Sequence, residues 1–394
     1  MSTALNIDEG FLLSGGGLLN KAMVKMRMRD QELAIGVFCV TWLPLFIFSA
    51  IEGTLYSGIQ LPFLKDVAMQ ARLLIALQML ILIKGAIDTR VTTVFRYFTE
   101  TLVKEEDRKT VVPTIIRRGK KLTDSTITEI LLLLLVIVVT TSFVRAGIYS
   151  SLEHGTSSWM TTVSDGNKVL SKAGYWAVLV SIPVFQFLLF RWLWRYFVWI
   201  LLLYRLSRTH LNLLPTHADR AGGLGIIMLA QRAFNKLFVV GSVVLSGQFI
   251  GLLTSHPEQF IMIRNEAIGY IIIAILFTLL PFVFFSRKLL RAKNAGLQKL
   301  SSLGFVLSSK FEREWAGDLA IEKRIENNED NKVDPSILFD YSGLYNEVKK
   351  IRSFPVTIGD ITGLGISLFI PFIPILFIRF SVGELLQRIL GMLV

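Results

Sequence analysis

Seven stretches of this chain are apolar over about the 20 residues that an α-helix needs to cross a bilayer. Of the 394 residues, 52% are hydrophobic and 18% are charged, whereas soluble domains carry about 25% charged residues. The sequence therefore predicts an all-α polytopic transmembrane helical bundle of about seven spans, with cytoplasmic helical insertions. The predicted spans lie at roughly 33 to 52, 66 to 87, 129 to 150, 173 to 200, 235 to 254, 266 to 286 and 360 to 380.

Lysine and arginine are unevenly distributed among the connecting segments, and these residues collect on the cytoplasmic side of a membrane. The loop 88 to 128 holds nine basic residues, the loop 287 to 359 holds thirteen, and the N-terminal tail carries Lys21, Lys25, Arg27 and Arg29. Few basic residues lie in the loops 53 to 65, 151 to 172 and 255 to 265. We therefore expect a cytoplasmic N-terminus and, with seven spans, an external C-terminus, unless the amphipathic stretch 383 to 394 lies along the interface or re-enters the membrane.

This layout divides the chain into four parts. A cytoplasmic tail with a basic amphipathic helix precedes a membrane domain of six spans that includes the loop 88 to 128. A cytoplasmic insertion, predicted as two helices joined by a polar linker, precedes the last span and its amphipathic C-terminus. The parts are 1-32, 33-286, 287-359 and 360-394. The single cysteine, Cys39, excludes an intramolecular disulfide and a thiolate metal cluster.

The most distinctive motif runs from Pro215 to Gly225, in the short loop between spans four and five. A polar turn is followed by glycines that permit positive φ angles. Two interpretations stand: Arg220 and a helix start bind an anion, or Asp219 caps the helix, Arg220 pairs with a carboxylate and Gly222 and Gly223 allow close packing. His217 and Asp219 alone are too few ligands to predict a metal site.

The run from Pro215 to Gly225 resembles a motif of uncharacterised bacterial multi-span inner-membrane proteins, in which His, Pro, Asp, Arg, Ala and two glycines follow one another. Ala218 stands where that motif has proline, and the similarity extends into span four, over Arg191, Trp192, Trp194 and Arg195. The resemblance implies a shared architecture and the bacterial cytoplasmic (inner) membrane, but no activity. From the residues alone, Arg191 and Arg195 are interpreted as snorkelling beside an interfacial aromatic belt.

Basic residues within spans are costly unless they face protein or water. Arg72, Lys84 and Arg145 fall in spans two and three, so a cavity lined by them would favour anions. Span five adds polar candidates for a transport pathway, with Gly247 and Gly251 as a small-residue pair that equally suits close helix packing. These polar candidates are Asn235, Ser242, Ser246 and Gln248.

The leading functional prediction is a channel or transporter for a small ion, with anions favoured. The alternative is a membrane-anchored signalling or assembly component that recruits a soluble partner through the loop 287 to 359. A lipid-modifying enzyme finds little support, because no nucleophile and base or paired acidic motif is present. The net charge of +12 fits basic loops beside anionic lipid headgroups. We expect no cofactor and no nucleic acid, and allow for a homo-oligomer.

Overall fold

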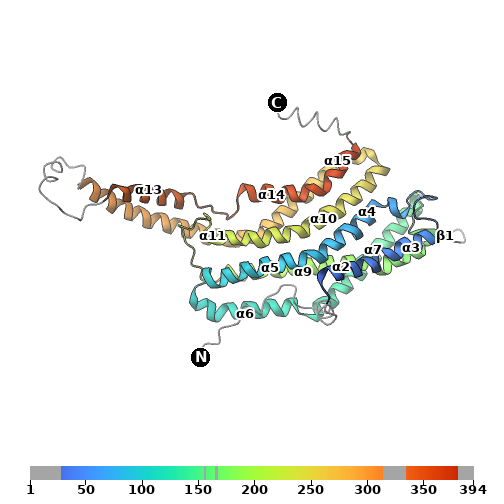
Figure 1. The fold of residues 1–394 in the computed structure, drawn as a ribbon, viewed down its shortest axis with the longest axis horizontal. Helices are drawn as coiled ribbons and strands as arrows, with labels where there is room; N and C mark the ends of the chain where they lie inside the picture. Colours follow the sequence, from blue (N-terminus) through green and yellow to red (C-terminus); the bar gives the residue numbers. More distant parts are fainter. Residues whose placement is uncertain (1–27, 155–156, 165–166, 314–333, 380–394) are drawn as a thin grey trace.

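The computed structural model describes residues 28–154, 157–164, 167–313 and 334–379. Within these ranges six helical segments are long and apolar enough to cross a membrane, and the pair α6 and α7, bent by 40°, makes a seventh if it forms one span. The predicted all-α transmembrane bundle is therefore confirmed (Figure 1). The six segments are Asp30–Ile51, Val67–Leu102, Lys172–Leu206, Leu224–Ser255, Pro257–Phe311 and Ile358–Ile378.

Several of these segments are built from more than one helix. The α-helices are α2 (Asp30–Thr41), α3 (Leu43–Ile51), α4 (Val67–Gln70), α5 (Leu77–Tyr97), α6 (Glu105–Thr123), α7 (Thr126–His154), α8 (Lys172–Trp176), α9 (Ile182–Leu206), α10 (Ile227–Ser255), α11 (Phe260–Phe311), α13 (Pro335–Lys349), α14 (Ile358–Phe369) and α15 (Ile373–Arg379). The π-helical turns are η3 (Ala71–Ala76), η4 (Phe98–Leu102) and η5 (Ala177–Ser181). The 3-10 turns are η2 (Phe63–Lys65), η6 (Leu224–Ile226), η7 (Pro257–Gln259) and η9 (Ile370–Phe372).

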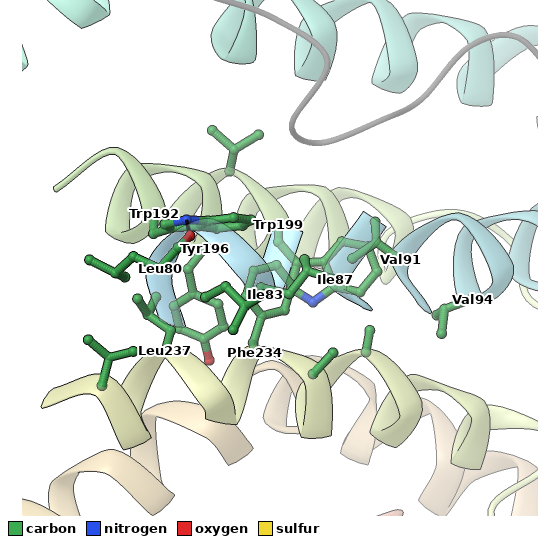
Figure 2. Close-up of a cluster of buried hydrophobic side chains, with 14 of the residues drawn as sticks. Leu80, Ile83, Ile87, Val91, Val94, Trp192, Tyr196, Trp199, Phe234 and Leu237 are labelled. Atoms are coloured by element: carbon green, nitrogen blue, oxygen red, sulfur yellow. Dashed lines mark hydrogen bonds between the residues drawn. The ribbon is translucent and has the colours of Figure 1, made fainter. Parts of the chain in front are cut away.

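Helix α5 forms the centre of the bundle because one of its faces is apolar at helical spacing. Leu80, Ile83, Ile87, Val91 and Val94 recur every three or four residues and are buried. Figure 2 shows them beside aromatic side chains of α9 and α10, among which Tyr196 contacts Phe234 with tilted rings whose centroids are 5.0 Å apart. The core therefore continues along α5 well past the predicted end of span two.

The two ends of the bundle differ. We call the end that carries α6, the loop 207–223 and the outer part of α11 with α13 the projection side, and the end that carries strands β1 (Thr161–Ser164) and β2 (Asn167–Leu170) the hairpin side (Figure 1). The antiparallel hairpin pairs Thr161 with Leu170. Beside it, Trp159 donates its indole N–H to Asp66 at 2.9 Å and packs edge-on against Phe63.

The interval 88–128, predicted as a loop, is largely helical, and the insertion 287–359 contains helices as predicted. The interval 88–128 contains the end of α5, η4 and α6, and α6 folds back along α9 because Val112 and Ile115 are buried. Helix α11 runs unbroken through span six into the predicted insertion, and α13 packs against it. The basic helix predicted at 18–29 lies almost wholly outside the described residues, and the amphipathic stretch 383–394 lies entirely outside them.

Candidate functional site

The predicted transport residues do not converge on one site. Lys84 forms a salt bridge with Asp30 of α2, with its amino nitrogen 3.3 Å from the carboxylate oxygen. Arg145 on α7 and Gln248 on α10 are both exposed on the surface of the bundle. A paired lysine and two outward-facing residues on different helices do not line a common cavity.

Arg72 is placed differently, within the π-helical turn η3 of span two. Its guanidinium carbon lies 5.9 Å from the ring centre of Phe185 on α9, and the side chain is partly buried. Asp66, which caps α4 by accepting from the backbone N–H of Met69 at 2.9 Å, attracts Arg72 electrostatically. Within the part of the chain that the structure describes, Arg72 forms no hydrogen bond or salt bridge, so its cation is stabilised by a ring face and a distant carboxylate.

The polar stripe of α10 packs against neighbouring helices. Asn235 is buried and donates its amide to Ser367 of α14 at 2.6 Å, while Ser242 and Ser246 are buried on the same helix. A Cβ atom at Gly247 would lie 2.7 Å from the Cβ of Ala71, so the backbones of α10 and η3 approach closely there. This geometry favours the packing interpretation of the stripe.

In the loop between α9 and α10, one carboxylate organises the turn. Asp219 accepts the backbone N–H groups of Ala221 at 2.8 Å, Gly223 at 3.1 Å and Gly225 at 3.0 Å, and the His217 Nδ1 lies 2.8 Å from it. Desolvation would raise the pKa of Asp219, but these hydrogen bonds together hold that pKa below its usual value. The donors that a bound anion would need are thus occupied by the protein's own carboxylate.

Arg220 and the glycines after it complete this turn. Arg220 has φ +52°, Gly222 +63° and Gly223 +94°, the left-handed region in which side chains beyond glycine are strained. The Arg220 guanidinium binds Glu347 of α13 through its Nε at 2.9 Å, and its carbonyl accepts the N–H of Arg352 at 3.1 Å. A hydrogen bond from Lys350 lowers the pKa of Glu347 most, and the hydrogen bond from Arg220 lowers it further. The motif therefore fastens α13 to the membrane domain.

The structure brings together a buried charge cluster that the sequence did not predict. Arg191 of α9 lies 3.4 Å from Glu129 of α7, with exposed side-chain fractions of 8% and 6%. Arg195, one turn further, is buried, rests 5.0 Å from the ring of Trp192 and is attracted by Asp88 of α5 and by Glu129. We define these four ionisable residues, Asp88, Glu129, Arg191 and Arg195, as the charge cluster.

The interpretation of Arg191 and Arg195 as snorkelling residues is wrong. Both arginines point into the bundle and are matched by acidic groups from α5 and α7. The signal in the sequence was Glu129 at the start of an otherwise apolar span and Asp88 near the predicted end of span two, each too costly to leave unpaired. Such a cluster can fix α5, α7 and α9 together.

No metal site is present among the described residues, which contain no group of three or more histidine, cysteine or acidic side chains placed to hold an ion. Cys39 is exposed on α2. Comparison with protein-family models, with curated proteins and with solved structures found no match. The fold and these sites define a class, an all-α transmembrane bundle with internal ion pairs and a helical projection, and the resemblance of the 215–225 motif stays a prediction.

Proposed function

We propose that the chain is a membrane-anchored assembly component that presents a rigid helical projection to a soluble partner protein. The observation that carries the proposal is the length of α11. Its 52 residues extend over about 78 Å at 1.5 Å per residue, whereas the hydrocarbon core of a bilayer is about 30 Å thick. About 48 Å of α11 therefore lies outside the hydrocarbon core, and most of it, about 38 Å, belongs to residues 287–311, which follow predicted span six.

The projection is fixed to the membrane domain. Besides the pairing of Arg220 with Glu347, Lys293 of α11 donates to the carbonyl of Ile351 at 2.8 Å, and Val348 is fully buried. Further out, Gly304 lets the Tyr341 ring of α13 lie directly against α11. Because these contacts hold α13 against α11 and the membrane domain at several points, the projection offers a partner a preorganised surface. This reduces the entropy lost on binding.

The outer part of the projection exposes large apolar side chains from both helices. Phe305 is 77% exposed and Phe339 is 79% exposed, and Leu303, Val306 and Ile337 are also exposed. Grouped apolar exposure on one element indicates an interaction surface. Lys299 and Lys310 lie one turn either side of Leu303 and Val306 on α11, so the matching partner is a helix with an apolar face and acidic edges.

The projection side is the cytoplasmic side in this proposal, and the membrane is the bacterial inner membrane. The basic residues of α6 and α11 support this orientation because positive charge collects in cytoplasmic segments. The same residues would lie beside anionic lipid headgroups. The membrane domain then acts as the anchor.

The test is capture of the partner from cells in which the chain is expressed at its native level. We expect a soluble protein to co-purify with the parent and to be lost from a Phe305→Glu, Phe339→Glu double variant. The matched control is Ser302→Glu with Ser342→Glu, which adds the same charge at exposed positions of α11 and α13 without removing apolar surface. Capture that survives in the phenylalanine variant, or that is also lost in the control, would contradict the proposal.

A second candidate, conduction of small anions, is favoured by Arg72 alone. A cation in a π-helical turn without a salt bridge in the described chain is typical of functional positions in membrane helices. Ion flux into liposomes should then exceed that of empty liposomes and fall in Arg72→Ala and Arg72→Glu, while Arg90→Ala, at an exposed position of α5, leaves it unchanged. No flux from the parent under several ions and potentials would reject conduction.

A further inference from the structure

An apolar groove opens on the surface of the membrane domain between α9, α10 and α11. Its cavity has a volume of about 410 Å³ and is lined almost entirely by apolar side chains, among them Leu193, Phe197, Ile200, Phe238, Ile273 and Phe277. Phe197, Ile273 and Phe277 are each at least half exposed, so the groove faces away from the bundle. In a spanning bundle this surface faces lipid.

The polar atoms in the groove walls are already satisfied. The Tyr196 hydroxyl donates to the carbonyl of Phe277 at 2.6 Å, and the Tyr270 hydroxyl donates to the carbonyl of Phe238 at 2.5 Å. Only the ring faces of these tyrosines are left for an occupant, since their hydroxyl hydrogens are engaged. The groove therefore suits a hydrocarbon chain and offers little to a polar solute.

Toward the projection side, the two walls of the groove continue into an aromatic pair and then into cations. On α9 the face of Phe197 continues at helical spacing to Tyr204, and Arg208 follows in the turn after the helix. On α11 the face of Phe277 continues to Phe284 and Lys288. Tyr204 and Phe284 meet edge to face with ring centroids 5.2 Å apart. The pattern of apolar groove, aromatic pair and cations matches the order of layers in one leaflet.

The cations at this end form a cluster with a positive balance. Arg208 donates to the Tyr204 hydroxyl at 2.8 Å and lies 5.1 Å from its ring centre. Lys288, which donates to the carbonyl of Thr209, lies within electrostatic range of Arg208 and Arg291, and Asp107 is the acidic group beside it. Asp107 is itself paired with His210, at 3.0 Å from its Nδ1. Three cations against one paired carboxylate favour an anionic ligand.

The spacing between groove and cations fits a lipid. Phe277 and Lys288 are eleven positions apart on one helix, which corresponds to about 17 Å along its axis, close to the thickness of about 15 Å of hydrocarbon in one leaflet. We propose that this groove binds one anionic glycerophospholipid of the adjoining leaflet, with an acyl chain between α9, α10 and α11 and its phosphate at Arg208 and Lys288. The proposal rests on the transmembrane fold and is independent of the partner protein.

The test is lipid retention, measured by native mass spectrometry of protein released from nanodiscs of phosphatidylcholine with and without phosphatidylglycerol. We expect selective retention of phosphatidylglycerol by the parent. Removing one cation, as in Arg208→Gln or Lys288→Gln, should weaken that retention by about fivefold, as expected for one basic residue at a membrane surface. Arg208→Lys should retain the lipid, and so should the control Arg90→Gln at an exposed position of α5.

A groove-filling variant separates the lipid from a free anion. Ile273→Trp, at a half-exposed position of the groove wall, should abolish retention while the cations remain. Glycerol phosphate, which carries the charge without an acyl chain, should fail to displace the lipid. Equal retention of both lipids by the parent, unchanged retention in Arg208→Gln and Lys288→Gln, or displacement by glycerol phosphate would each overturn the assignment.

Discussion

Several polar side chains of the spans donate hydrogen bonds to backbone carbonyls of neighbouring helices. A helical carbonyl has a second lone pair that can accept such a bond, and in a membrane an unsatisfied donor would cost several kcal/mol. The donors come from large aromatic residues and serine, so each bond also fixes a close interhelical packing contact. They are Trp176 to Val40, Ser181 to Thr41, Trp192 to Leu80, Tyr196 to Phe277 and Tyr270 to Phe238.

At residue scale, the turn at Asp219 gives a prediction about pH. Because hydrogen bonds hold the folded pKa of Asp219 below its unfolded value of about 3.9, its stabilising contribution is complete above that value and is lost as pH falls through the folded pKa. Asp219→Asn should therefore lower the free energy of unfolding by about 1 to 3 kcal/mol at pH 7. Thermal unfolding in detergent at pH 7 and pH 3 measures this, and a difference that persists undiminished at pH 3 would contradict it.

The charge cluster predicts a large loss of stability when one of its carboxylates is removed. Removing one partner of a buried ion pair leaves an uncompensated charge and costs about 3 to 5 kcal/mol. Glu129→Gln should destabilise the bundle by this amount, because Arg191 and Arg195 stay buried. The control is Glu105→Gln, whose salt bridge to Lys109 is about three quarters exposed, so that its loss costs under about 1 kcal/mol. Unfolding in detergent that gives equal values for the two variants would show that the cluster is solvated.

At the scale of helices, close approach of α10 to η3 depends on a single glycine. A Cβ at Gly247 would lie 2.7 Å from Ala71 Cβ and 3.1 Å from the carbonyl oxygen of Val67, whereas Gly251, one turn on, has no atom within 4 Å of that position. Gly247→Ala should therefore destabilise the bundle by about 1 to 3 kcal/mol through overpacking. Gly251→Ala should be neutral or stabilising by up to about 1 kcal/mol. Thermal unfolding of both variants tests this. A lower melting temperature for Gly247→Ala alone supports close packing at the polar stripe of α10, and equal melting temperatures would contradict it.

Helix positions in the membrane could be predicted from the sequence because apolar length alone identifies them. The helical structure of 88–128 could not, because the apolar face of α5 beyond Asp88 is interrupted by polar residues and is buried only by its contacts with α9 and α10. The pairing of Arg191 with Glu129 also depends on a contact between α7 and α9. The pattern within one helix cannot show which residues of another helix will face it. For this reason the sequence predicts Arg191 and Arg195 at the membrane interface, although they are buried in the bundle.

At the scale of the whole molecule, the two ends are built for different environments. The hairpin side is small and closed by the β1–β2 hairpin, while the projection side carries α6, the Asp219 turn and the α11–α13 projection (Figure 1). The Asp219 turn was predicted as either structural or anion-binding, and its donors are occupied within the chain. The projection side also carries most of the basic residues, and we therefore expect it to face the cytoplasm.

The orientation of the bundle in the membrane can be tested at its two ends. Ser157 lies on the hairpin side, where it hydrogen-bonds with Gln60, and Ser301 lies on the projection. Positive charge should hold the projection side in the cytoplasm. Reporter fusions at Ser157, Ser301 and Val394 should therefore be external, cytoplasmic and external. A cytoplasmic reporter at Ser157 would reverse the orientation and remove the cytoplasmic partner from the proposed function, whereas a cytoplasmic reporter at Val394 alone would change only the crossing of the segment that begins with α14.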